Sequence, residues 1–168
     1  DTIYPQLIAI RRDLHQHPEL GLEEYRTSAL VLDYLQQWNI KVTQLIGETA
    51  IVGLIEGNPG EKTIGLRADM DALPMKEETS CDFKSTNGCM HSCGHDMHTA
   101  MLLGAAKLLK QNQSQIEGTI KLVFQPDEEG FTGAKKMIAA GVLENPKVDA
   151  AMAMHVHSGT PSNLVLCG

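Results

Sequence analysis

The sequence predicts an α/β fold, a three-layer sandwich with a mostly parallel central sheet. Three observations support this class: apolar residues at helical spacing in several segments, short apolar or alternating runs between them, and polar clusters directly after those runs. Strands that alternate with helices along a chain are typical of a sheet covered by helices on both faces. The length of 168 residues, with 42% hydrophobic and 21% charged residues, fits one ordinary globular domain.

Two helices are predicted in the first 40 residues, because apolar residues repeat there at helical spacing. The first helix ends near Pro18, since the residue before a proline disfavours helical backbone. Its apolar residues are Ile3, Leu7, Ile10 and Leu14. Those of the second helix are Leu22, Tyr25, Ala29, Leu32, Leu35 and Trp38.

Three segments with β character follow, at Ile40 to Ile46, Ala50 to Glu56 and Thr63 to Arg67. An Asn-Pro-Gly turn signal at 58–60 lies between the last two. We therefore expect those two strands to form a hairpin.

Four further elements are predicted in the second half of the chain. His98 to Lys110 is rich in Ala, Leu and Met and indicates a helix, whereas Thr119 to Phe124 alternates as a strand does. Phe131 to Ala140 predicts a short helix that Gly141 closes. Asp149 to Val156 is a run of small residues and Met, which favours a buried strand.

Polar side chains follow three of the predicted strands. Asp69 and Asp71 end one strand, Gln125 to Glu129 end another, and His155 and His157 end a third. Ligands of open α/β sheets bind beyond the carboxyl ends of the strands, so these clusters are expected to converge on one edge of the sheet.

The strongest chemical signal is a short segment rich in His and Cys. The chain has 7 His and 4 Cys, and five of these eleven residues lie between Cys89 and His98. Thiolate and imidazole are the usual ligands of zinc-like ions. In an extended segment Cys93 and His95 face the same side and could share one metal, and Gly94 would let the backbone approach the ion.

Other interpretations of the same segment stay open at this point. One is a loop with incidental His and buried Cys. Another is a structural zinc site of Cys89, His91, Cys93 and His95, although four alternating ligands in one segment cannot easily close a tetrahedron. A third is a thiol redox pair of Cys89 and Cys93, which would leave the carboxylates unused.

The adjacent residues Glu128 and Glu129 could have two different roles in a metal site. Neighbours in near-extended chain point to different sides, so one carboxylate could bind metal while the other acts as a general base. The alternative is a solvated acidic turn. Asp69 and Asp71, which alternate at a strand end, could ligate metal or orient a ligand His through a hydrogen bond, and Asp71 could instead cap a helix.

Composition excludes several other classes. The formal net charge of −7 leaves no basic patch for nucleic acid or an anionic membrane, and no apolar run approaches the length of a membrane helix. Neither a phosphate-binding glycine loop nor a Gly-x-Ser-x-Gly nucleophile motif occurs. Four cysteines in this length do not indicate a secreted disulfide framework, so we expect a cytoplasmic protein.

Together these motifs resemble the metal-dependent aminoacylase and carboxypeptidase superfamily. The branch they are most similar to includes hippurate hydrolases, N-acyl-amino-acid deacylases and indole-acetyl-amino-acid hydrolases. The residues that carry the resemblance are Arg11 to Leu20, Leu66 to Pro74, Cys93 to Thr99, Val123 to Gly130, and His155-Val156.

The resemblance implies a hydrolytic site with two divalent ions, zinc or manganese before nickel or cobalt. It implies four metal ligands, namely Cys93, His95, Glu129 and His155, with His157 a weaker candidate. Glu128 is implied as the general base that takes a proton from a water bridging the metals. Asp71 is implied as the catalytic support, and Asp69 and Asp96 are further supports that the motifs leave open.

The resemblance also bears on domain organisation. We expect residues 1–160 to be the N-terminal part of a catalytic domain and 161–168 to begin a lid or dimerisation domain that is not present, together with one more His ligand. The expected activity is hydrolysis of the amide bond of an N-acyl amino acid or a small peptide-like amide, by a homodimer or higher oligomer. The alternative is a metal-binding fragment that is inactive without its C-terminal half.

Overall fold

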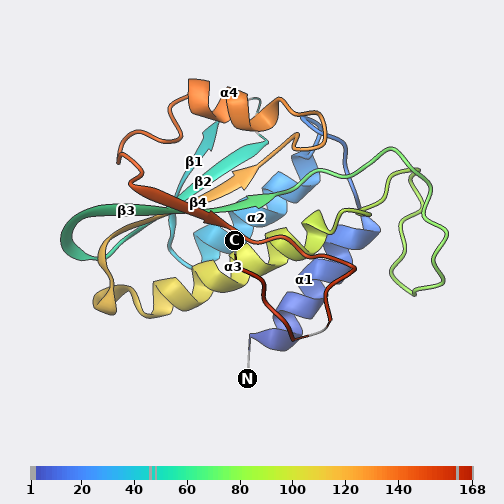
Figure 1. The fold of residues 1–168 in the computed structure, drawn as a ribbon, viewed down its shortest axis with the longest axis horizontal. Helices are drawn as coiled ribbons and strands as arrows, with labels where there is room; N and C mark the ends of the chain where they lie inside the picture. Colours follow the sequence, from blue (N-terminus) through green and yellow to red (C-terminus); the bar gives the residue numbers. More distant parts are fainter. Residues whose placement is uncertain (1–2, 46, 48, 162, 168) are drawn as a thin grey trace.

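The chain folds around one five-stranded sheet with the strand order β1-β2-β4-β3-β5 (Figure 1). This computed structural model describes residues 3–45, 47, 49–161 and 163–167. The elements are α1 (Tyr4–Gln16), α2 (Tyr25–Gln37), β1 (Lys41–Leu45), β2 (Ala50–Glu56), β3 (Asn58–Asp69), α3 (His95–Gln111), the 3₁₀ turn η1 (Gln113–Gln115), β4 (Glu117–Gln125), α4 (Gly133–Ala139) and β5 (Ala150–Ala153). Ile46, the expected end of the first strand, lies outside the described residues.

The sheet is mixed. β3, β4 and β5 are parallel to one another, whereas β1 and β2 are antiparallel to their neighbours. The predicted α/β sandwich is confirmed, and its parallel half is the half that carries the polar clusters. The expected hairpin between β2 and β3 is wrong, because β4 lies between them. On strand β4, Leu122 is buried in the core on one face of the sheet and Val123 packs against the core on the other face. A strand with apolar side chains on both faces buries the most apolar surface at a central position in the sheet.

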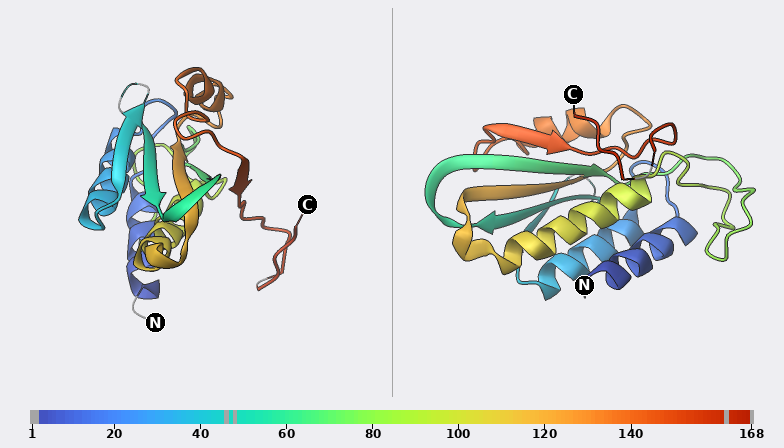
Figure 2. Two further views of the ribbon diagram at one scale, coloured as in Figure 1. Left: turned by 90° about the vertical axis from the view of Figure 1, so that its left-hand side faces the viewer. Right: turned by 60° about the horizontal axis from the view of Figure 1, so that its bottom comes forward.

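Helices cover both faces of the sheet and make three layers. α1, α2 and α3 lie side by side on one face and α4 lies on the other (Figure 2). The alternation of β2 supplies both interfaces: Ile51 and Ile55 join the large core under α1 to α3, while Ala50 and Val52 pack with Met137 of α4. No helix among the described residues has the length and apolar character that crossing a bilayer requires.

Helix α3 begins three residues earlier than expected, at His95. Its N-cap is Gly94, whose φ of +86° lies in the left-handed region. A Cβ at this position would also collide with the side chain of Val156. The expectation of an extended segment at 93–95 is therefore wrong: the chain turns at Gly94, and His95 enters the first turn of a helix.

Strand β5 is exposed along its whole length, so its predicted burial is wrong. Within the described part of the chain it pairs with β3 alone and forms an edge of the sheet. The small side chains of β5 had suggested a buried strand. Because they are small, they expose little apolar surface to solvent at the edge of the sheet.

A buried lysine ties the sheet to the segment after α4. Lys121 on β4 is 2% exposed. Its ammonium donates hydrogen bonds to the backbone oxygens of Val142 (2.9 Å), Glu144 (2.7 Å) and Pro146 (2.7 Å). These three acceptors replace the hydrogen bonds to water that the ammonium loses when it is buried.

Candidate metal centre

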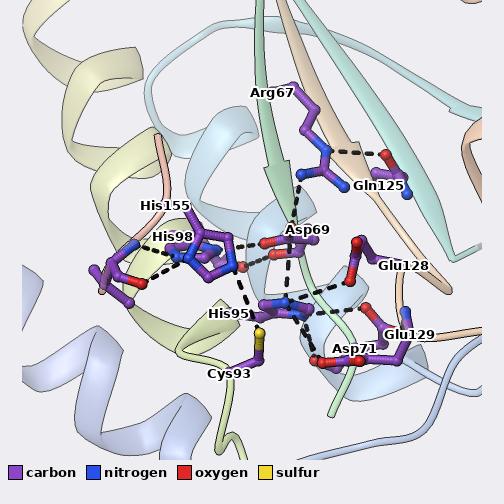
Figure 3. A network of polar contacts seen from close by, with 12 residues as sticks. Arg67, Asp69, Asp71, Cys93, His95, His98, Gln125, Glu128, Glu129 and His155 are labelled. Carbon is purple, nitrogen blue, oxygen red and sulfur yellow. Dashed lines mark hydrogen bonds and ion pairs between the residues drawn. The ribbon is translucent and has the colours of Figure 1, made fainter. Parts of the chain in front are cut away.

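The polar clusters that follow three strands meet the start of α3 at one edge of the sheet (Figure 3). Asp69 ends β3 and Asp71 follows it, Glu128 and Glu129 follow β4, and His155 follows β5. Cys93 and His95 come to the same place from the turn into α3. The structure therefore brings together the side chains that the sequence singled out for metal binding and catalysis.

His95 lies at the centre of this cluster and is fully buried. Its Nδ1 hydrogen-bonds to the backbone oxygen of Asp71 at 2.8 Å and lies 3.2 Å from the carboxylate of the same residue. Among the described residues its Nε2 has no hydrogen-bond partner, and it lies 3.8 Å from Glu128 Oε2 and 3.9 Å from Glu129 Oε1. One ring nitrogen is thus held by the protein while the other faces two carboxylates.

Asp71 connects three parts of the site. It follows β3, contacts the His95 ring, and accepts a hydrogen bond from the backbone N–H of Glu129 at 2.9 Å. Burial alone would raise the pKa of Asp71, but the hydrogen bonds from the His95 ring and from the N–H groups of Glu129 and Glu128 hold it below its ordinary value. Asp71 is therefore an anion that fixes the His95 ring. It does not cap a helix in this structure, since the cap of α3 is Gly94.

Glu128 and Glu129 lie in a turn after β4, where Phe131 N–H bonds to Glu128 O at 2.9 Å. The expected near-extended arrangement with the two side chains on opposite sides is wrong, because both carboxylates point toward His95. Their surroundings still differ. The Glu128 side chain is 35% exposed and that of Glu129 is 23% exposed. One oxygen of Glu129 is buried and has no hydrogen-bond partner in the part of the chain that the structure describes, whereas Glu128 has more access to solvent.

Cys93 and His155 close the other side of the cluster. Cys93 Sγ lies 3.5 Å from His155 Nε2, and both fall in one group with His95 whose ligand atoms lie within 4.8 Å of one another. Burial and the charges of Glu129, Glu128 and Asp69 raise the pKa of the Cys93 thiol to about 11. This concentration of carboxylates around the thiol favours the binding of a positive ion between the side chains.

His98 also belongs to the site, although its position in the sequence motif indicated no role for it. Its Nδ1 lies 2.6 Å from Asp69 Oδ1, and its Nε2 accepts the backbone N–H of Val156 at 2.9 Å. Both nitrogens are engaged, so the ring connects the end of β3 to the segment that carries His155. The signal was present: His95 and His98 are three apart, which places them on one face of a helix once the helix start is known.

The imidazole of His98 and the guanidinium of Arg67 hold Asp69 in place. Besides His98, it contacts Arg67 NH1 at 2.7 Å, and Arg67 in turn donates from Nε to Gln125 at 2.9 Å. Burial opposes ionisation of Asp69, but the hydrogen bond from His98 and the charges of His95, Arg67 and His98 lower its pKa to about 2.

Several residues considered from the sequence lie outside the cluster. The His157 ring accepts the N–H of Gly159 within its own turn, and Asp96 points away toward α1. In the part of the chain that the structure describes, no close group of ligand atoms includes Cys89 or His91, so the structural zinc site of four alternating ligands is not formed. All four cysteines are free thiols.

The donor set fits divalent metal ions. Imidazole, thiolate and carboxylate groups suit zinc, and the carboxylates also suit manganese. The orphaned atoms His95 Nε2 and Glu129 Oε1 are buried and face each other. A metal-ligating imidazole usually donates its other ring N–H to a carboxylate or a backbone oxygen, and Asp71 offers both to His95. The residues present therefore match the requirements of a metal centre.

The α/β sandwich and the side chains gathered at its edge define the class: a domain of the metal-dependent hydrolase type. Within that class, the chain belongs to peptidase family M20/M25/M40, whose family model matches residues 65–166. The resemblance inferred from the motifs is thereby confirmed.

Known relatives support the assignment. The chain is 49% identical to thermostable carboxypeptidase 1 of Saccharolobus solfataricus over 94% of its length, and 46% identical to an N-acetyl-L-cysteine deacetylase of Bacillus subtilis over 92%. A solved dinuclear metal-binding peptidase of the M20 family from Bacillus subtilis superposes with a TM-score of 0.91 at 40% identity, covering 95% of this chain and 45% of that one. The chain spans 41% and 37% of the two curated relatives.

Proposed function

We propose that the protein hydrolyses the amide bond of an N-acyl amino acid, or of a small peptide-like amide, with the help of two divalent metal ions. The observation that carries the proposal is the orientation of His95: Asp71 holds one ring nitrogen, and the other faces Glu128 and Glu129 with no hydrogen-bond partner among the residues described. The names of the relatives, a carboxypeptidase and a deacetylase, describe enzymes that act on peptide or acyl bonds.

The proposed ligands are Cys93, His95, Glu129 and His155. Zinc or manganese fits this donor set best, and nickel or cobalt also fits. Such ions, when bound, polarise an amide carbonyl and make water more acidic. The dinuclear centre of the solved relative supports two ions per site.

Glu128 is the proposed general base. Of the two carboxylates beside His95 it is the more exposed, so it can meet both a water molecule and a substrate. It would accept a proton from the attacking water and then donate it to the nitrogen of the leaving amine, which cannot depart as an anion. Asp71 contributes by holding His95 and the Glu129 backbone.

The test is Glu128→Gln in the full-length protein, with Glu61→Gln on the exposed part of β3 as the matched control. We expect the metal content to persist in both variants and hydrolysis of N-acetyl amino acids to fall roughly 10²-fold or more in the first only. A wild-type protein that binds metal but cleaves no acyl amino acid would support the alternative, a non-catalytic metal-binding domain. Unchanged hydrolysis by Glu128→Gln would overturn the base assignment.

Three broader expectations complete the proposal. Residues 1–160 form the N-terminal part of the catalytic domain, and 161–168 begin a lid or dimerisation domain; of the latter, residues 162 and 168 lie outside the described chain. The full-length protein is a homodimer or higher oligomer. It works in the cytoplasm, where the four cysteines would stay reduced.

A further inference from the structure

A second polar cluster lies behind the start of α3, on the side away from the candidate metal centre. Its members are Arg11 and His15 on α1, Glu77 in the loop between β3 and α3, and Asp96 in the first turn of α3. His15, Glu77 and Asp96 are at most 6% exposed. None of the roles proposed above uses them.

Asp96 anchors the first turn of α3 to α1. Its Oδ2 hydrogen-bonds to His15 Nδ1 at 2.8 Å and forms an ion pair with Arg11 Nε, also at 2.8 Å. The N-cap Gly94 offers no side chain to hold the start of this helix. Because Asp96 directly follows His95, this hydrogen bond and this ion pair also fix the backbone that carries the His95 ring.

Glu77 extends the cluster toward Cys93. Its Oε1 lies 3.1 Å from His15 Nε2, and its Oε2 accepts the backbone N–H of Ser85 at 2.6 Å. Ser85 in turn donates its hydroxyl to the backbone oxygen of Cys89 at 2.5 Å. These contacts reach Cys89, which precedes Cys93 in the same loop.

His15 joins the two parts of this cluster, because it contacts both Asp96 and Glu77. Each of its nitrogens faces a buried carboxylate, so the ring can donate to Asp96 and Glu77 at the same time only when it carries two N–H groups. The hydrogen bond to Asp96 is the main reason that the pKa of His15 is raised, which favours that doubly protonated form. The two cations, Arg11 and His15, then balance the two anions, as buried charges require.

We propose that His15 is a positioning residue for the metal centre, holding the backbone of His95 through Asp96 and the loop that leads to Cys93 through Glu77. The proposal rests on the proposed function of the centre. It explains why a charged cluster is buried between α1 and α3, where an apolar contact would pack at a lower cost in desolvation.

The test compares His15→Gln with Leu14→Ala in the full-length protein. Leu14 is the neighbouring core residue, fully buried, and its truncation destabilises the same helix without touching the cluster. Co²⁺ is titrated into metal-free protein, and both the dissociation constant and the thiolate-to-cobalt charge-transfer band are recorded. Both readouts report the geometry of the centre independently of turnover.

We expect His15→Gln to weaken Co²⁺ binding about tenfold, the lower end of what loss of a supporting partner costs, and to alter the thiolate band. Leu14→Ala should keep the wild-type band and affinity even though it unfolds at a lower denaturant concentration. Equal changes in both variants would overturn the proposal, because they would assign the effect to stability alone.

Two further measurements make the outcome decisive. If His15→Gln does not fold, Glu77→Gln replaces it, since that change weakens only the part of the cluster that contacts the loop; wild-type affinity and band in Glu77→Gln would then contradict the proposal. A wild-type protein without any cobalt–thiolate band would contradict the proposed metal centre itself. A normal wild-type band with an unchanged His15→Gln spectrum would reject only the role of His15.

Discussion

The His95 ring hydrogen-bonds to the backbone oxygen of Asp71 at 2.8 Å, and the Asp71 carboxylate lies 3.2 Å from the same nitrogen. This relationship sets the direction of the opposite nitrogen, which faces Glu128 and Glu129. Because Asp71 also binds the Glu129 N–H, one carboxylate fixes both the imidazole and the acidic turn that face each other.

Removing the charge of Asp71 should weaken metal binding. In Asp71→Asn the side chain keeps its size but attracts the His95 N–H less strongly, so we expect the metal affinity to fall about 10- to 100-fold. Isothermal titration with Zn²⁺ measures this. Asp149→Asn, which alters an ion pair with the exposed Lys62, should leave the affinity unchanged. Equal affinities of wild type and Asp71→Asn would show that the contact does not support a metal ligand.

Gly94 should tolerate no side chain. Gly94 and Gly88 share a φ of +86°, but a Cβ at Gly94 meets Val156, whereas a Cβ at Gly88 meets nothing within 4 Å. We expect Gly88→Ala to cost about 1–2 kcal/mol of unfolding free energy from the backbone alone. Gly94→Ala should cost more and also lower metal affinity, because it pushes away the segment that carries His155. Denaturant unfolding and metal titration of both variants give the comparison, and identical losses would contradict the role assigned to Val156.

Glu24 should make stability depend on pH. Its carboxyl is fully buried and accepts the Asp127 N–H at 2.9 Å, and its second oxygen has no hydrogen-bond partner within the described ranges of the chain. Burial raises the pKa of Glu24 to about 7 from 4.5. The folded protein therefore binds this proton more tightly than the unfolded chain. Its stabilising effect is complete below pH 4.5, declines as the pH rises to about 7, and is absent above that.

The shift corresponds to roughly 3 kcal/mol across this range. Glu24→Gln keeps an acceptor for the Asp127 N–H but cannot ionise, so its stability should decline less between pH 4.5 and 7 than that of the wild type. Urea unfolding at several pH values, in excess chelator, measures the difference. Parallel profiles for the two proteins would show that Glu24 does not titrate in this interval.

Lys121 should be needed for stability and not for chemistry. The methionine side chain of Lys121→Met fills about the same space, but the three backbone oxygens lose their hydrogen-bond donor. We expect a loss of about 2–4 kcal/mol in unfolding free energy. Lys62→Met, at a lysine whose side chain is 77% exposed, should leave the unfolding free energy almost unchanged. Thermal and denaturant unfolding of both variants measure these losses, and similar values would contradict the prediction.

Much of the fold could be predicted because its signals are local. The helices α1 and α2 and the strands β2 and β4 lie where the apolar spacing indicated, since periods of 3.6 and 2 residues depend only on neighbours in the chain. The partners of the strands could not be predicted in the same way. The turn signal at 58–60 indicated a hairpin, but β4 separates β2 from β3 because its two apolar faces need cover.

The candidate site shows the same division. The types and spacing of Cys93, His95 and Glu129 indicate metal chemistry from the sequence alone, and the fold brings these side chains together. The side on which Glu128 points, the part played by His98 and the cluster around His15 were not predictable. Each depends on a turn or helix start whose exact position alters the direction of a side chain by a large angle.

The sequence by itself determined the α/β class, most helices and strands, and the residue types that suit a metal centre, because short-range periodicity and donor chemistry are properties of the chain. Only the tertiary structure decided the strand order, the exposure of β5, and the contact of Asp71 with both His95 and the Glu129 backbone. These features join residues tens of positions apart. They are settled by which apolar faces can be covered at once and which buried charges can be paired.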